Sequence, residues 1–115
     1  MNVHLKLIIL HLDLQTMANG CLVDEGHIIS RPLLCSDIGS GLRDILLDYL
    51  EIKPEWVKFN LVDVLYDESN IEIVYTCLIP AIIKNIKGQW IPLGTINDQE
   101  NKRLVFQASQ KVFAG

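Results

Sequence analysis

The sequence predicts an α+β fold in which a mixed or antiparallel sheet is flanked by two helices. Two segments repeat apolar residues at helical spacing, whereas several others alternate or run continuously in the manner of strands. The chain has 115 residues, of which 50% are hydrophobic and 21% are charged. This length supports one cored domain and is too short for two, so we expect a single domain over residues 1–115.

The N-terminal region is expected to form strands. Apolar residues first alternate with His4 and Lys6 and then change parity. This pattern predicts a strand over residues 3–14 that either is buried on both faces further along or carries a bulge. Residues 21–23 and 27–29 predict a short hairpin, because Gly26 in the polar turn between them tolerates the positive φ of a tight turn.

The first helix is predicted over residues 36–52. Its apolar face is formed by Leu42, Ile45, Leu46, Tyr49 and Leu50. Ser36 or Ser40 is expected to cap its start, and Pro54 is expected to stop it.

The second half of the chain predicts a hairpin followed by a helix. Residues 57–66 and 71–80 are rich in β-branched and aromatic residues and are separated by a polar turn. Residues 81–86 are compatible with a further strand, and Pro92 favours an edge position or a bare connection for residues 90–93. Asn97, three residues before Glu100, predicts the start of a helix that ends near Phe113. Its core stripe is expected to be Leu104, Val105, Ala108 and Val112.

Composition excludes several classes of function. The formal charge is −4 and no basic stripe is visible, so phosphate neutralisation on a nucleic acid is not expected. No stretch reaches the 18 or so apolar residues of a membrane span, and no signal peptide is recognisable. Cys21, Cys35 and Cys77 lack the spacing of a metal site or a disulfide framework, so they are expected to be buried thiols of a cytoplasmic protein.

The start of the first predicted helix is a candidate ligand-binding site. Gly39, Ser40 and Gly41 form a glycine-containing turn, and Arg43 follows within the first helical turn. Backbone amides at a helix start favour an anion, and an arginine can add a charge-assisted bond. The alternative is that Ser40 is only a cap and the glycines only a turn.

The polar face of the same helix is a candidate metal site. Asp44, Asp48 and Glu51 are spaced at i, i+4 and i+7, and carboxylates on one face can share Mg²⁺. The same spacing is typical of a solvated helix face. Leu47 interrupts this polar face, so it is a candidate interface residue.

The remaining candidates are aromatic residues and histidines. Phe106 and Phe113 are expected on the side of the last helix opposite its core stripe, where they either form a surface for a protein partner or a second copy, or are buried by a second face. Trp56 and Trp90 are expected in the core or at its rim, although either could stack on a purine. The three histidines share no spacing with a Ser or Cys, so no catalytic residue is assigned.

The order of these elements resembles that of a Nudix domain. The resemblance is carried by residues 41–49 of the first helix, by the hairpin LVDVLYDESNIEIVYTCLIP, and by the closing QWIPL before the last helix. It extends over residues 3–113 and implies an α/β/α sandwich with a mixed sheet.

The Nudix motif, GX5EX7REUXEEXGU with U aliphatic, implies metal-binding glutamates that activate water on a diphosphate. Aligned with this chain, its arginine falls on Arg43, the next glutamate on Asp44, and the two metal-binding glutamates on Leu47 and Asp48. The upstream glycine and glutamate fall on Ile29 and Cys35, and the later glycine on Leu50. Because Leu47 cannot bind a metal, the resemblance implies a Nudix-like fold whose usual hydrolytic machinery is largely missing.

The sequence therefore favours a domain that binds over an enzyme. The first hypothesis is a Nudix-like domain without catalysis or cofactor that binds a nucleotide-type ligand, a protein partner or a second copy. The alternatives are a divergent Mg²⁺-dependent nucleoside diphosphate hydrolase using Asp44, Asp48 and Glu51, or a small α+β interaction module with no link to nucleotides.

Overall fold

A computed structural model describes residues 2–13, 18–34, 37–80 and 82–113. The strands within these ranges are β1 (Asn2–Asp13), β2 (Ala18–Asp24), β3 (His27–Pro32), β4 (Asn60–Tyr66), β5 (Asn70–Pro80) and β6 (Gln89–Pro92). The helices are α1 (Ile38–Tyr49) and α2 (Gln99–Phe113), with short 3-10 turns η1 (Pro54–Trp56) and η2 (Leu93–Thr95).

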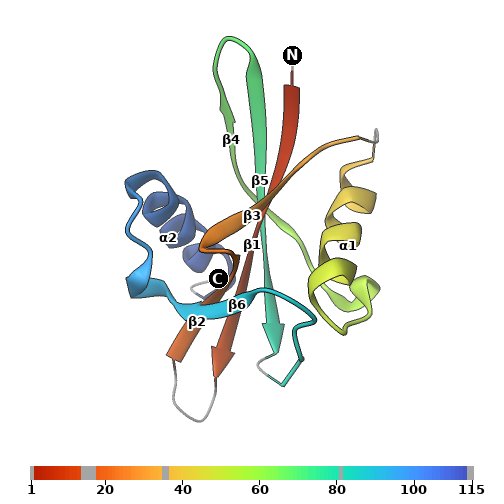
Figure 1. Cartoon of the computed structure of the whole chain (residues 1–115), viewed down its shortest axis with the longest axis vertical. Coiled ribbons are helices and arrows are strands. Elements are labelled where there is room, and N and C mark those ends of the chain that lie inside the picture. Colours follow the sequence, from red (N-terminus) through yellow and green to blue (C-terminus); the bar gives the residue numbers. More distant parts are fainter. Residues whose placement is uncertain (1, 14–17, 35–36, 81, 114–115) are drawn as a thin grey trace.

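The strands form one mixed sheet in the order β4-β5-β1-β3-β2-β6, and β2 also pairs with the end of β1. β1 runs parallel to β5 and antiparallel to β2 and β3. Helices α1 and α2 lie on opposite sides of this sheet (Figure 1). The predicted α+β class, a mixed sheet flanked by two helices, is confirmed.

β1 is the central strand because its apolar residues serve both faces of the sheet. Leu5, Leu7 and Ile9 belong to the core beneath α1, whereas Ile8 and Leu10 belong to the core beneath α2. The strand is half-exposed at its start and buried on both faces from residue 7 to residue 10, as its change of parity predicted.

Two hairpins form where turn residues predicted them. Between β2 and β3, Glu25 and Gly26 both adopt positive φ, 51° and 82°, which is the conformation that a two-residue hairpin turn requires. Between β4 and β5, the Asp67 carboxylate accepts hydrogen bonds from the backbone amides of Ser69 and Asn70, both at 2.9 Å. β4 begins at residue 60, three residues later than expected, and its pairing register shifts between Leu61 and Asp63.

The helices are shorter than the sequence predicted. α1 ends at Tyr49 because Leu50 is extended and forms an isolated antiparallel bridge with Asn85. At the start of α2 the cap is Asp98, not Asn97, since the Asp98 carboxylate accepts from the backbone amide of Asn101 at 3.1 Å. The predicted α2 stripe is confirmed, because Leu104, Val105 and Ala108 are buried and Val112 packs against them.

Residues 82–86 do not form the expected strand. They turn back toward α1, where the backbone amide of Ile86 donates to the carbonyl of Tyr49 and that of Glu51 donates to the carbonyl of Lys84. Residue 81 lies outside the described residues. β6 is an edge strand paired only with β2 in the described sheet, as Pro92 predicted.

The described cysteines are core residues. Cys21 and Cys77 are both buried free thiols, and burial raises the pKa of Cys21 to about 12 and also raises the pKa of Cys77, so we expect neither thiol to be reactive at neutral pH. Cys35 lies outside the described residues. Neither described helix has the length and apolar character needed to cross a membrane.

Candidate ligand-binding site

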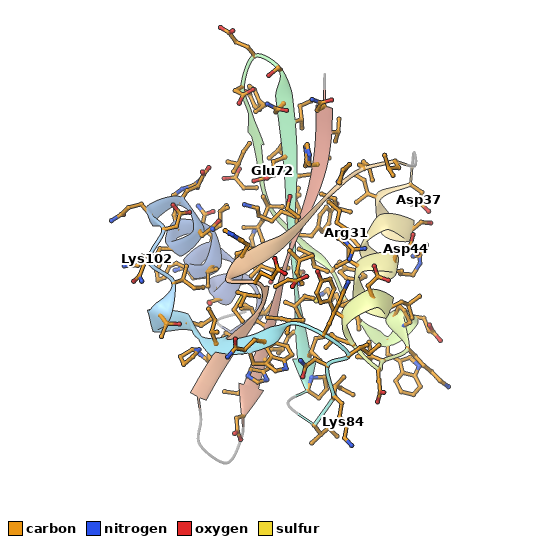
Figure 2. All side chains as sticks on the ribbon, in the orientation of Figure 1. Arg31, Asp37, Asp44, Glu72, Lys84 and Lys102 are labelled. Carbon is orange, nitrogen blue, oxygen red and sulfur yellow. The ribbon has the colours of Figure 1, made fainter. Side chains whose placement is uncertain are left out.

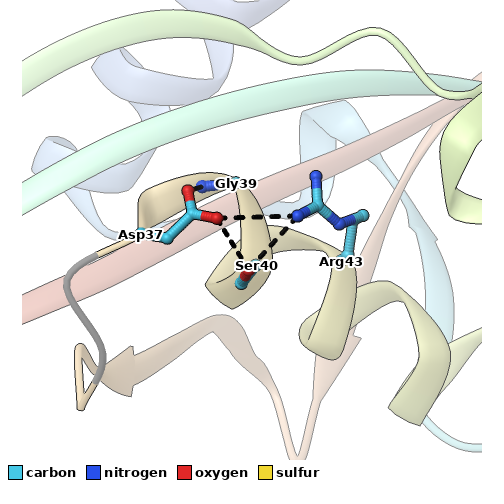
Figure 3. Close-up of polar contacts among 4 residues, drawn as sticks. All are labelled: Asp37, Gly39, Ser40 and Arg43. Atoms are coloured by element: carbon cyan, nitrogen blue, oxygen red, sulfur yellow. Dashed lines mark hydrogen bonds and ion pairs between the residues drawn. The ribbon is translucent and has the colours of Figure 1, made fainter.

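The start of α1 binds a carboxylate of its own chain. Asp37 precedes the helix, and its carboxylate accepts hydrogen bonds from the Gly39 amide at 3.0 Å and from the Ser40 hydroxyl at 2.8 Å (Figure 3). The Arg43 guanidinium donates to the Ser40 hydroxyl at 3.2 Å and lies 3.7 Å from the Asp37 carboxylate. The hydrogen bond from Ser40, the bonds from the backbone and the charge of Arg43 hold the pKa of Asp37 below its usual range.

This arrangement corrects the predicted cap. Ser40 is not the residue that caps α1; its hydroxyl is a donor to Asp37, which is the cap. Ser36, the other candidate, lies outside the described residues. The donors of the predicted anion site are therefore already in contact with the Asp37 carboxylate, so an external anion would have to compete with it.

The two glycines at this turn differ in what surrounds them. A Cβ atom on Gly41 would lie 2.9 Å from a methyl carbon of Leu5 and 3.3 Å from one of Leu33, so glycine lets α1 approach β1 closely. A Cβ on Gly39 would lie 3.2 Å from the Arg43 guanidinium. Gly41 thus has a structural role beside any role in ligand binding, whereas the flexible Arg43 side chain could move away from a methyl group at residue 39.

A cavity of about 260 Å³ opens beside this turn, between the end of β3 and α1. Its walls are apolar except for Arg31 and Asp44, and they include Gly41 and Leu5. Arg31 points from β3 toward the helix that carries Asp44 (Figure 2). The cavity is just below the volume range of typical small-molecule sites, so it suits one part of a larger ligand.

Arg31 organises a polar cluster beside α1 that the sequence did not predict. Its guanidinium donates to the Asp48 carboxylate and lies 5.5 Å from the centre of the Tyr49 ring. The Tyr49 hydroxyl donates to Asp24, and the Lys87 ammonium lies 4.7 Å from the same ring. The hydrogen bond from Arg31, with the charges of Arg31 and Lys87, lowers the pKa of Asp48.

One signal for Arg31 was present in the sequence. Ile29 is buried beneath α1, and residues two apart on a strand share a face, so Arg31 had to point toward α1 as well. The partners of Arg31 come from α1, which follows β3 in the chain, so only the tertiary structure identifies them.

The predicted metal ligands are not brought together. Glu51 lies beyond the end of α1, and the Asp48 carboxylate is engaged by Arg31. Among the described residues, no three His, Cys, Asp or Glu side chains form a group that could hold a metal ion. Asp44 and Leu47 are exposed on α1. Because Arg31 neutralises the carboxylate that Mg²⁺ would need, these residues do not fit the ion.

The predicted interface residues have different environments. Leu47 is 52% exposed and Phe106 is 64% exposed, so both present apolar surface. Phe113 is half-buried and packs against the core beneath α2, so the two phenylalanines do not form an exposed pair. Phe113 contacts the apolar cluster beneath α2, whereas Phe106, two helical turns earlier, is exposed to solvent.

The two tryptophans also lie in different environments. Trp90 packs against the core beneath α1, whereas Trp56 is 75% exposed at the end of η1. Trp90 thus matches the expected core or rim position, and Trp56 does not belong to the core.

Searches of protein-family models and of curated proteins find no match to this sequence. Solved structures with a similar fold include the NUDIX domain of Shewanella oneidensis NrtR complexed with ADP ribose, with a TM-score of 0.69 and 12% identity over 96% of this chain and 87% of that one. A MutT/nudix family protein from Enterococcus faecalis has a TM-score of 0.68 and 9% identity over 98% of this chain. The chain spans 62% of the length of the Enterococcus protein. The fold is therefore Nudix-like.

Proposed function

We propose that this protein is a Nudix-like domain that binds a nucleotide-type ligand without hydrolysing it. The observation that carries the proposal is the contact between Arg31 and Asp48 beside the exposed Leu47. Because Asp48 is engaged by Arg31, α1 presents polar groups that can bind a ligand, but the described residues offer no group of carboxylates placed to bind a metal.

Hydrolysis of a diphosphate by a metal-activated water needs carboxylates that are available to the metal. On α1, Leu47 has no ligand atom, and the Asp48 carboxylate already accepts a hydrogen bond from Arg31. A positive guanidinium at this position also repels a divalent cation. These features favour binding over catalysis.

Support for a nucleotide-type ligand comes from chemistry and from the fold. A domain of the same fold has been crystallised with ADP ribose. Here the wall of the cavity beside α1 holds Arg31 and Asp44, whose polar groups suit the hydroxyls of a ribose, and the apolar remainder suits part of a base. Gly39, Ser40, Gly41 and Arg43 border this region and would receive a phosphate, in exchange for their contacts with Asp37.

The test is calorimetric titration of ADP ribose into the protein, once with EDTA and once with Mg²⁺. We expect saturable binding with the same affinity in both buffers. A ligand at about 100 times its dissociation constant should also raise the free energy of unfolding by about 2.7 kcal/mol. Arg31→Gln should weaken binding, whereas Lys102→Gln on the exposed side of α2 should not. Absence of binding to ADP ribose, AMP and NAD would reject the proposal.

A second candidate function is recognition of a protein partner through α2. Phe106 borders a shallow hollow of about 340 Å³ whose walls include Leu93, Val105 and Lys102. An exposed aromatic ring beside a hollow is typical of an interface anchor. Phe106→Ser should then abolish capture of the partner while leaving the binding of nucleotides unchanged.

A further inference from the structure

A larger and more apolar groove lies beyond the C-terminal end of α1. It has a volume of about 540 Å³, and its lining is apolar except for Glu51 and Lys53. Trp56 on one wall is 75% exposed, and Ile82 on the other is 88% exposed. Large apolar side chains gathered around one groove mark a contact surface, in contrast to single exposed ones.

The same groove is bounded by an open sheet edge. β4 pairs with β5 only as far as Thr76, whereas β1 continues alongside β5 to Pro80. Within the described residues, the stretch 77–79 is therefore paired on one side only, whereas Pro80 has no backbone N–H and its carbonyl accepts a hydrogen bond from the amide of Ile83 at 3.1 Å. Leu78 and Pro80 line the groove. Trp56 of η1 lines the same groove as these two residues of β5. An open edge presents backbone donors and acceptors that another strand can satisfy.

We propose that this groove and the open edge of β5 form a homodimer interface, in which residues 77–79 of two copies pair antiparallel about a two-fold axis. Trp56 and Ile82 of each copy then enter the groove of the other. A two-fold axis brings the same surface patch of both copies together, so one strand edge and one apolar patch are enough to build the interface. The inference does not depend on the proposed nucleotide ligand.

The charges at the groove favour a second copy over a small anion. Glu51 and Lys53 both line the groove, and they carry opposite charges two residues apart. A site for an anion would be weakened by the Glu51 carboxylate, whereas a two-fold interface can place Glu51 of one copy beside Lys53 of the other. Lys53 also lies 5.0 Å from the centre of the Trp56 ring, so the charge and the apolar anchor belong to one surface.

The exposed apolar side chains at the groove supply the centre of an interface, and the polar turns around them would supply the rest of its area. A stable interface buries about 800 Å² on each partner, and one fully buried Trp supplies roughly 150–250 Å². Trp56 and Ile82, together with the partly exposed Leu78 and a paired strand edge, can supply the centre of such a patch. Polar atoms of the neighbouring turns would form its rim.

The test is sedimentation velocity of the full chain over roughly a hundredfold concentration range, because association follows mass action. We expect a species of twice the chain mass to form with increasing concentration. Trp56→Ser and Ile82→Ser should each shift the protein to monomer, whereas Phe106→Ser, an exposed apolar site on α2, should not. Circular dichroism checks that each variant is folded, and the very exposed Ile82 provides a second variant if Trp56→Ser is unstable.

A charge exchange tests the arrangement of the two copies. Glu51→Lys and Lys53→Glu should each raise the dimer dissociation constant about tenfold, because they place like charges together, and the double exchange should restore it. A monomer at every concentration would overturn the proposal. So would a dimer that Phe106→Ser disrupts and Trp56→Ser leaves intact, because that dimer would use another surface.

Discussion

The imidazole of His11 and the indole of Trp90 lie face to face, with ring centroids 4.0 Å apart and ring planes 4° from parallel. His11 is on β1 and Trp90 is on β6, and the two strands are separated by β2. The residue of β2 that pairs with His11 is Gly20, and a Cβ atom there would lie 2.3 Å from Nε2 of the imidazole. The imidazole thus covers the glycine and connects the edge strand to the centre of the sheet.

This relationship predicts that Gly20→Ala destabilises the protein. The new methyl group would force the imidazole away from Trp90, and overpacking of this kind costs about 1–3 kcal/mol in the free energy of unfolding. Urea denaturation measures the loss. Gly94→Ala is the matched control, because nothing lies within 4 Å of the added atom, and it should change stability by less than about 0.5 kcal/mol. Equal effects of the two substitutions would contradict the prediction.

The environment of His11 predicts that the free energy of unfolding depends on pH. Burial lowers the pKa of His11, and the nearby charge of Asp13 only partly opposes this effect. Its Nδ1 atom is buried and makes no hydrogen bond within the described residues, so a proton there would be poorly accommodated. Below about pH 6.5 the unfolded state therefore binds a proton more readily than the folded state, and stability falls as pH falls.

The measurement is the urea midpoint at about pH 7.5 and about pH 5.5, on either side of the imidazole's ordinary pKa. His11→Phe keeps a ring against Trp90 and removes the titration, so its midpoint should fall less between the two values. The carboxylates with lowered pKa, including Asp48 and Asp37, lose their contributions only at lower pH, near and below about 4. A wild-type midpoint that falls no more than that of the variant would exclude His11 as the cause.

Local sequence signals predicted the elements whose structure is set by neighbouring residues. Gly26 identified the β2–β3 turn, and the apolar period of α2 identified its buried stripe. Alternation along β1 identified a strand buried on both faces, because each face is a property of residue parity.

Contacts between distant residues determined what the sequence did not predict. α1 ends at Tyr49, although the apolar pattern continues, because Leu50 pairs with Asn85. The same pairing prevents a strand over residues 82–86. The Arg31 cluster was missed for a similar reason, since Asp48 and Tyr49 reach Arg31 only when α1 packs on the sheet. Nothing in a single sequence specifies these partners.

We predict that Asp37 weakens the binding of an anionic ligand at the start of α1. Its carboxylate occupies the donors of Gly39 and Ser40 and lies beside Arg43. Asp37→Ser removes the negative charge and retains a capping oxygen, so the thermal midpoint should change little. The dissociation constant for ADP ribose should fall about fivefold, because the substitution removes a negative charge that repels the phosphates of the ligand. Titration calorimetry of both proteins measures the change.

Glu68→Ser is the control for this substitution, since it removes a carboxylate from the exposed β4–β5 turn and should leave the affinity unchanged. The affinity of Asp37→Ser for ADP ribose could instead be lower than that of the wild type, or equal to that of Glu68→Ser. Either result would show that the start of α1 does not bind the anion.

The last prediction concerns the absence of hydrolysis. The Asp48 carboxylate is held by Arg31, and Leu47 offers no ligand atom, so α1 lacks the acids that would bind a metal and activate water. With ADP ribose and Mg²⁺ or Mn²⁺, we expect no release of AMP above that of buffer. Leu47→Glu by itself should not create activity, because Arg31 still neutralises Asp48. Turnover by the wild-type protein that Asp48→Asn abolishes would establish the opposite, a hydrolase that uses Asp48 despite its contact with Arg31.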